Sequence, residues 1–246
     1  MNRKINVTIY NENYHEQTMP EVREIYPEGI HHAVAAALPE QQTGVVRFAT
    51  LDDHESSLSQ EALDDTDVLI WWGHAKHEAV SDAVVERCAQ RVLHGMGLIV
   101  LHSGHASKLM RRLLGTETHL LRWREAGERA RLWTVLPGHP IAQGLPETFV
   151  VPRDETYGEP FGIPQPDELV FLTWFQGGEV FRSGCTWQRG AGKIFYLQNG
   201  HETYPVYWQP EIRRILSNAV LWACPPERQV TPDRGPGNVP PLEPAD

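Results

Sequence analysis

Ionisable and hydroxyl side chains follow four strand-like segments of the sequence, at 5–10, 68–72, 98–101 and 192–197. The residues at these segment ends are Asn11, Glu12 and His15, then Gly73, His74 and His77, then His102, Ser103 and His105, and finally His201 and Glu202. Because ligands bind beyond the carboxyl ends of strands in a parallel sheet, we expect these residues to surround one cavity. Imidazole and carboxylate groups move protons near neutral pH and bind divalent metals. The pattern predicts a small-molecule site.

His102 and Ser103 directly follow a buried segment and precede Gly104. A strand, a sharp turn and a helix in that order form a nucleophile elbow, which exposes one side chain near a helix N-terminus. Either His102 or Ser103 could hold that exposed position. An ordinary strand-to-helix turn with a capping serine is the alternative interpretation.

Three further candidates have weaker local signals. His201, just past a buried strand, could be a general base or a metal ligand, or a hydrogen-bonded loop histidine. His74 and His77 have the i, i+3 spacing that suits a metal if a helix begins there, although no zinc signature is matched. Glu155, in a Pro/Gly-rich loop before Tyr157, could complete a metal shell or act as an acid/base, or be a solvated carboxylate.

The first 115 residues alternate between strand-like and helix-like segments. We predict strands at 5–10, 45–49, 68–72 and 98–101, with helices at 29–38, 59–63, 78–94 and up to Gly115. The uninterrupted apolar runs of the third and fourth strands are typical of strands covered on both faces. This order predicts an α/β fold, a doubly wound, mostly parallel sheet flanked by helices.

The second half of the chain predicts an added small β section. Residues 120–166 contain short strand-like pieces among Gly and Pro, and Gly177-Gly178 suits a hairpin between strands at 169–172 and 185–187. A strand at 192–197 and an amphipathic helix from Pro210 complete the domain. We therefore predict one domain over 1–224 and a Pro-rich tail over 225–246, which is extended, disordered or draped over a neighbour.

Composition narrows the classes of partner. The formal net charge of −10 at pH 7 disfavours nucleic acid. No apolar run reaches the roughly 20 residues that a membrane helix needs, and no secretory signal is evident. Three widely spaced cysteines indicate no disulfide framework, so we expect a cytoplasmic protein. Eight tryptophans in an acidic chain are typical of sugar binding, because indole faces stack on sugar rings, although core packing would also explain them.

Five motifs together resemble the ThuA-like proteins, named for trehalose utilisation, over about residues 4–224. The motifs are Trp71-Trp72-Gly73-His74 with His77, Leu98-Ile99-Val100-Leu101-His102-Ser103-Gly104-His105, Gly138-His139-Pro140-Ile141 with Gly144, Glu155-Thr156-Tyr157-Gly158, and Gly200-His201-Glu202. The resemblance implies a class I glutamine amidotransferase-like (flavodoxin-like) fold. It also implies a role in the metabolism of disaccharides or related carbohydrates.

The same resemblance argues against glutamine hydrolysis. The nucleophilic cysteine of amidotransferases falls on His102, and none of the three cysteines lies near an elbow. The base histidine falls on His201, with Glu202 beside it, but the second position after His201 is Thr203, so the usual His-x-Glu spacing is lost. An imidazole in place of the thiolate is better suited to shuttle protons or bind a metal.

We therefore expect a sugar-active enzyme, an isomerase or hydrolase of a disaccharide or oxidised sugar. The expected catalytic residues are His102, His201, Glu155 and Ser103, of which the first three could hold a divalent metal such as zinc. The expected substrate contacts are Glu12, Gly73, His74, His105, Tyr157 and Glu202. We expect a carbohydrate ligand but no nucleotide cofactor, nucleic acid or membrane partner, and a homo-oligomer is left open. The alternatives are an inactive sugar-binding or assembly module whose tail docks a partner, and a hydrolase with Ser103 as nucleophile and His201 as base.

Overall fold

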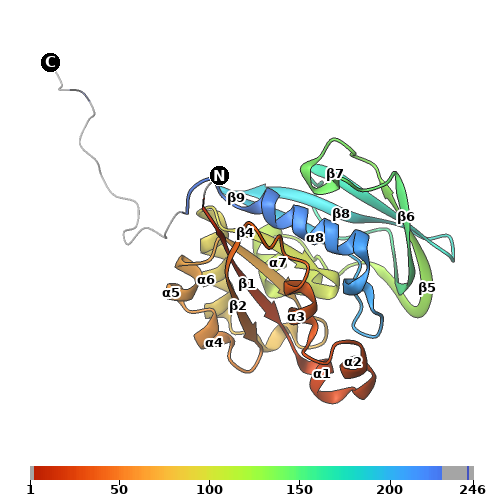
Figure 1. The fold of residues 1–246 in the computed structure, drawn as a ribbon, viewed down its shortest axis with the longest axis horizontal. Helices are drawn as coiled ribbons and strands as arrows, with labels where there is room; N and C mark the ends of the chain where they lie inside the picture. The colour runs from red at the N-terminus through yellow and green to blue at the C-terminus, as the bar shows by residue number, and fades with distance from the viewer. Residues whose placement is uncertain (1–2, 229–242, 244–246) are drawn as a thin grey trace.

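A nine-stranded mixed sheet runs through the whole molecule (Figure 1). The computed structural model describes residues 3–228 and residue 243. One half of the sheet is parallel and has the order β2-β1-β3-β4-β9. Its strands are β1 (Ile5–Asn11), β2 (Thr43–Thr50), β3 (Val68–Trp72), β4 (Gly97–Leu101) and β9 (Gly192–Leu197). This half is the predicted α/β core.

The other half of the sheet is antiparallel and continues the order as β8-β7-β5-β6. Its strands are β5 (Arg122–Thr134), β6 (Thr148–Gly158), β7 (Glu168–Phe175) and β8 (Val180–Arg189). The prediction of a doubly wound sheet with a small β section therefore underestimates the antiparallel part, which contributes four strands to the same sheet. Residues 120–166 form two long strands, because alternate residues of β5 such as Ala130 and Leu132 are buried while their neighbours face outward.

Helices cover both faces of the parallel half (Figure 1). α3 (Ile30–Ala35) and α8 (Pro210–Ala223) lie on one face, and α5 (Gln60–Asp64), α6 (Asp82–Leu93) and α7 (Lys108–Leu114) on the other. The remaining short elements are α1 (Tyr14–Thr18), α2 (Pro20–Ile25), α4 (His54–Ser57), η1 (His77–Ala79), η2 (His102–Ala106), η3 (Pro140–Ala142) and η4 (Val206–Trp208). None of the helices within the described ranges is long and apolar enough to cross a bilayer.

Two predicted helices are longer than the real ones. The helix predicted over 78–94 begins at Asp82, because the Ser81 hydroxyl accepts the backbone N–H of Val84 and caps it. His74 and His77 therefore precede this helix and do not share one of its faces. The helix predicted over 29–38 is confined to α3.

The tryptophans divide between core and surface. Trp71, Trp72 and Trp187 are buried in the sheet, where core packing accounts for them. Trp123 and Trp174 are 67% and 54% exposed, and both come from the antiparallel half. These are the two most exposed indoles among the described residues, ahead of Trp208 and Trp133, so they are the first candidates for ligand contact.

The predicted tail is described only at its beginning. Residues 225–228 continue from α8, and apart from residue 243 the rest of the predicted tail lies outside the described residues. The predicted division into a domain and a tail stays a prediction.

Candidate functional site

The carboxyl ends of four neighbouring strands, β1, β3, β4 and β9, meet at one edge of the sheet. This arrangement brings together the imidazoles of His74, His102 and His201, which follow β3, β4 and β9. Their ring centroids are 5.2 Å (His74–His201), 5.3 Å (His102–His201) and 5.5 Å (His74–His102) apart. His74 and His201 are 127 positions apart in the sequence, yet the three imidazoles share one small volume.

Glu155 joins the three histidines from the antiparallel half of the sheet. It lies in β6 and not in a loop as predicted, because residues 148–158 pair along β5. Gln198 donates from Nε2 to the carbonyl of Glu155 at 3.1 Å, and Asn199 donates to the Asp154 carboxylate at 2.8 Å. These two bonds connect β6 to the loop after β9, and they place Glu155 beside the histidines.

We name His74, His102, Glu155 and His201 the His/Glu cluster. One ligand atom from each of the four lies within 4.8 Å of the others, and all but His74 are buried. Imidazole nitrogen and carboxylate oxygen are ligands that zinc and other divalent transition metals take. The donor set therefore fits a divalent metal.

Each imidazole of the His/Glu cluster has a partner at Nδ1. His102 Nδ1 lies 2.9 Å from the Gln198 carbonyl, His74 Nδ1 lies 2.8 Å from the Glu202 carboxylate, and His201 Nδ1 lies 2.8 Å from the Thr203 hydroxyl. A carbonyl or carboxylate only accepts, so Nδ1 donates in His102 and His74 and Nε2 is left for another partner. This division of the two nitrogens is typical of metal-bound histidines.

His102 Nε2 and Glu155 Oε2 lie 3.2 Å apart, but neither has a well-aligned hydrogen-bond partner among the described residues. Both atoms are buried, and as two facing acceptors they would be costly, unless a proton or a metal cation lies between them. Burial lowers the pKa of His102, but the adjoining Glu155 carboxylate outweighs it and raises that pKa to about 9. The position between the two atoms therefore favours positive charge.

Two neighbours have pKa values that suit the same chemistry. Burial, with the nearby His102, lowers the pKa of His201 to about 4, so its imidazole is neutral at pH 7, the form that binds metals. Burial raises the pKa of Glu202, but the bond to His74 and the charges of His74, His201 and His15 together outweigh burial and lower that pKa to about 2. Glu202 is therefore a carboxylate that orients His74.

The turn after β4 has the strained geometry of the predicted elbow. His102 has a φ of 50°, in the left-handed region that non-glycine residues avoid. The prediction of an exposed side chain is wrong, because His102 is fully buried and Ser103 is only 7% exposed. The Ser103 hydroxyl is 2.8 Å from the Tyr157 hydroxyl rather than bonded to a histidine, which leaves the proposed serine nucleophile without a base.

A cavity of about 260 Å³ opens beside the His/Glu cluster. Its lining is rich in imidazole and aromatic side chains: His74, His77, Ser103, His105, Ala106, His119, Trp123, Glu155 and Tyr157. Trp123 and His119 are exposed and form its rim. Sequence reasoning did not single out Trp123, whose place opposite Tyr157 depends on the pairing of β5 with β6.

The predicted substrate contacts fall into two groups. His74, His105 and Tyr157 line the cavity, and burial lowers the pKa of His105 to about 3, so that imidazole stays neutral. The Glu12 carboxylate instead accepts hydrogen bonds from the backbone N–H groups of residues 74, 75 and 76, at 2.8–2.9 Å. Glu12 and Glu202 position His74, and Gly73 lies against Glu12, so the geometry favours a supporting role for these three.

The family model described as trehalose utilisation matches residues 6–223. The chain belongs to the ThuA family. Family membership gives the protein a carbohydrate-related role, and it agrees with the resemblance found in the sequence. A search of curated proteins found no match.

Solved structures show the same fold. A ThuA-like protein from Bacteroides uniformis has a TM-score of 0.63 and 17% identity, with 90% of this chain and 92% of that chain covered. A ThuA-like protein from Parabacteroides merdae has a TM-score of 0.63 and 14% identity, with 90% of each chain covered. A protein from Salmonella typhimurium named as cytoplasmic has a TM-score of 0.59 and 10% identity, over 90% of this chain and 99% of that one. At these identities the likeness concerns the fold alone.

Proposed function

We propose that this ThuA family member is a metal-dependent enzyme that isomerises an oxidised disaccharide or related sugar. The observation that carries the proposal is the His/Glu cluster, in which three imidazoles held at Nδ1 meet a carboxylate within 4.8 Å. Family membership supports the sugar class. Glycoside hydrolysis usually needs two carboxylates beside the bond. Among the described residues that line the cavity only Glu155 is acidic, which favours isomerisation over hydrolysis.

Different residues of the chain would bind the metal, stack on the sugar ring and contact the sugar hydroxyls. His74, His102, His201 and Glu155 would hold a divalent metal such as zinc, which supplies a Lewis acid that polarises a sugar carbonyl or hydroxyl. Trp123 would stack on a sugar ring at the rim. Burial lowers the pKa of His77 to about 4, so His77 would meet the sugar hydroxyls as a neutral imidazole.

A turnover assay on the full chain tests this function. The protein, loaded with zinc or manganese, would be incubated with trehalose and with trehalose oxidised at one ring hydroxyl, and products followed by NMR and mass spectrometry. We expect a product of unchanged mass from the oxidised sugar, lost on chelation and restored by metal. His102→Ala and His201→Ala should each lower turnover about 100-fold or more, as loss of a metal ligand does.

His94→Ala is the matched control, since His94 lies at the end of α6 with its Nδ1 on the Gln90 carbonyl. Release of free monosaccharide would instead establish hydrolysis. Saturable sugar binding without turnover would favour the binding module, and cluster variants as active as His94→Ala would contradict the proposal.

A further inference from the structure

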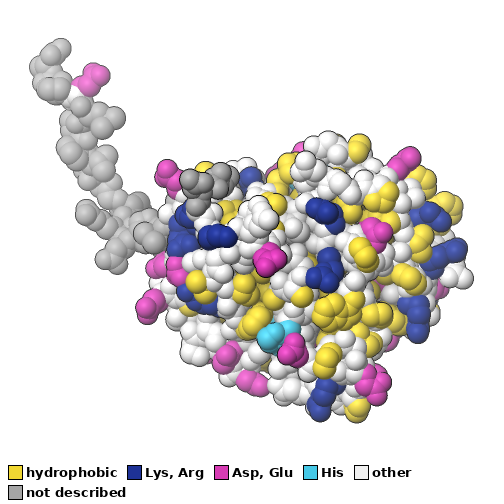
Figure 2. All heavy atoms as spheres, in the orientation of Figure 1, with side chains coloured by type: hydrophobic (Ala, Val, Ile, Leu, Met, Phe, Trp, Pro, Cys, Tyr) yellow, Lys and Arg dark blue, Asp and Glu magenta, His cyan; other side chains and the backbone are white. Residues whose placement is uncertain are grey.

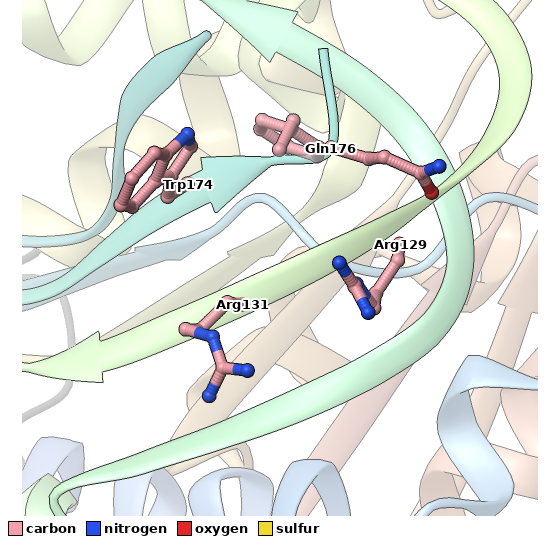
Figure 3. Close-up of a pocket in the computed structure, with 5 residues that line it drawn as sticks. Arg129, Arg131, Trp174 and Gln176 are labelled. Carbon is pink, nitrogen blue, oxygen red and sulfur yellow. The ribbon is translucent and has the colours of Figure 1, made fainter. Parts of the chain in front are cut away.

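A second ligand-sized hollow lies on the antiparallel half of the sheet, away from the cavity described above. Its volume is about 210 Å³, and Figure 3 shows its labelled residues: Arg129 and Arg131 from β5, Trp174 from β7, and Gln176 just beyond β7. Arg131 is directly opposite Trp174 in the ladder, and the Gln176 N–H donates to the Arg129 carbonyl at 3.0 Å. The four side chains therefore form a two-by-two block on one face, which we name the Arg/Trp block.

The two arginines of the Arg/Trp block lack a carboxylate partner. No ion pair within the described part of the chain involves either, and the polar contact of the Arg131 guanidinium is the Thr148 hydroxyl at 3.4 Å. Arg124 on the same strand, by contrast, is paired with both Glu128 and Glu179. Two like charges side by side on one face of a strand repel, and a bound anion would relieve that repulsion.

The positive charge of the Arg/Trp block contrasts with the negative net charge of the whole chain. The chain has a net charge of −10, and some of the Lys and Arg side chains visible in Figure 2 lie over β5 and β6. A guanidinium presents a planar fork that suits phosphate and carboxylate groups. The Arg/Trp block therefore has the charge and the donors to hold an anion.

Trp174 extends the requirement beyond an inorganic ion. It is 54% exposed beside Arg131, and an exposed indole face is a surface on which a sugar ring stacks. Gln176 adds an amide that can bond to a hydroxyl on either side. The single exposed indole offers one stacking face, which favours contact with one sugar ring.

We propose that the Arg/Trp block is a binding site for an anionic monosaccharide, with the ring on Trp174 and its phosphate or carboxylate on Arg129 and Arg131. The site is separate from the His/Glu cluster and does not require the proposed isomerase activity. The Arg/Trp block would bind a charged sugar while the cavity beside the His/Glu cluster binds a different sugar.

Binding of small probes to the full chain tests the proposal. Glucose 6-phosphate, glucuronate, glucose, inorganic phosphate and AMP would each be titrated, with affinity measured by calorimetry and by tryptophan fluorescence. We expect glucose 6-phosphate or glucuronate to bind at least tenfold more tightly than glucose or phosphate alone, and the preferred one identifies the anion. Arg131→Gln and Trp174→Ala should each weaken that binding about tenfold or more.

Two control variants make the result decisive. Arg214→Gln, at an exposed arginine of α8, should bind as the wild type does, and so should His102→Ala, which separates this site from the cluster. Circular dichroism melts would establish that each variant is folded. Equal binding of inorganic phosphate, preference for AMP, no binding of either charged sugar at millimolar concentration, or undiminished binding in Arg131→Gln would overturn the proposal.

Discussion

At the scale of single residues, the partners of the imidazoles define the site as much as the imidazoles do. A histidine fixed at Nδ1 presents Nε2 in one direction. His102 and His74 donate from Nδ1 to a carbonyl and a carboxylate, and His201 Nδ1 contacts the hydroxyl of Thr203 and accepts its backbone N–H. Such outer contacts hold ligands in place before a metal arrives. Changing a partner should therefore change metal affinity without removing a ligand.

Glu202→Gln tests that inference. The ionised Glu202 carboxylate orients His74 and increases its basicity, so the neutral amide should lower zinc affinity about tenfold to 100-fold. Affinity would be measured by competition with a chromogenic chelator. Glu86→Gln, at an exposed glutamate of α6, should bind zinc as the wild type does. Equal affinity in both variants would argue against the cluster as a metal site.

Trp123→Ala tests the sugar contact. Removing the exposed indole from the rim should raise KM about tenfold and leave kcat within a few-fold, because stacking acts on ground state and transition state alike. Kinetics with the oxidised sugar would measure both constants. Trp133→Ala is the control, since Trp133 is 37% exposed on the same strand but does not line the cavity. A fall in kcat alone would contradict the stacking role.

The sequence predicted three of the four cluster residues by a simple rule, that ligands gather beyond parallel strand ends. His74, His102 and His201 obey it. Glu155 was named from its type and from the family resemblance, but its position in β6 depends on long-range pairing that no local pattern encodes. Trp123 was missed for the same reason.

At the scale of elements, the loop between β3 and α6 is fixed by one carboxylate. Glu12 accepts backbone N–H bonds from residues 74, 75 and 76, and it is 2% exposed. A carboxylate offers enough lone pairs for all three, whereas an amide has one oxygen and adds a donor. The loop that positions His74 is thus built from its contact with β1.

Glu12→Gln should therefore weaken the loop and, through it, the metal site. We expect a loss of roughly 1–3 kcal/mol in the free energy of unfolding, typical of buried donors left without a partner. Urea unfolding would measure it, and zinc affinity should fall in parallel. Glu28→Gln, at an exposed position, is the control. Wild-type stability in Glu12→Gln would show that the three bonds contribute nothing.

Local patterns predicted β3 and β4 because their burial on both faces leaves continuous apolar runs. They failed for β5 and β6, where only alternate residues are buried and several are charged, so the strands looked like loop sequence. The start of α6 was misplaced because the capping Ser81 was not recognised.

At the scale of the whole molecule, the two ends of the continuous described segment 3–228 meet at one buried acid. Arg228 is bonded through its guanidinium to both oxygens of Asp67 at 2.9 Å, and Arg3 pairs with the same carboxylate at 2.6 Å. Burial raises the pKa of Asp67, but the two arginines outweigh burial and hold that pKa below its usual range. A truncation meant to remove only the tail should therefore be made after Arg228 rather than at Pro225.

Asp67→Asn should lower the free energy of unfolding by about 2 kcal/mol at pH 7, since it breaks charge-assisted bonds. The folded-state pKa is depressed, so the stabilisation is fully present above the ordinary value of 3.8 and is lost as pH falls through the folded value. Unfolding of both proteins between pH 7 and pH 3 would measure it. The difference in the free energy of unfolding between the wild type and Asp67→Asn should become smaller only at the acid end of this range. A difference independent of pH would contradict the ion-pair origin.

The central claim, that three strand-end histidines and Glu155 form a metal site, is tested most directly by elemental analysis. The full chain would be loaded with zinc, desalted and measured by mass spectrometry beside the double variant His102→Ala/His201→Ala and the control His94→Ala. We expect about one equivalent of zinc per chain in the wild type and control, as one cluster implies, and almost none in the double variant. A wild type that retains no zinc, manganese or other divalent metal, or a double variant that retains as much, would contradict the account.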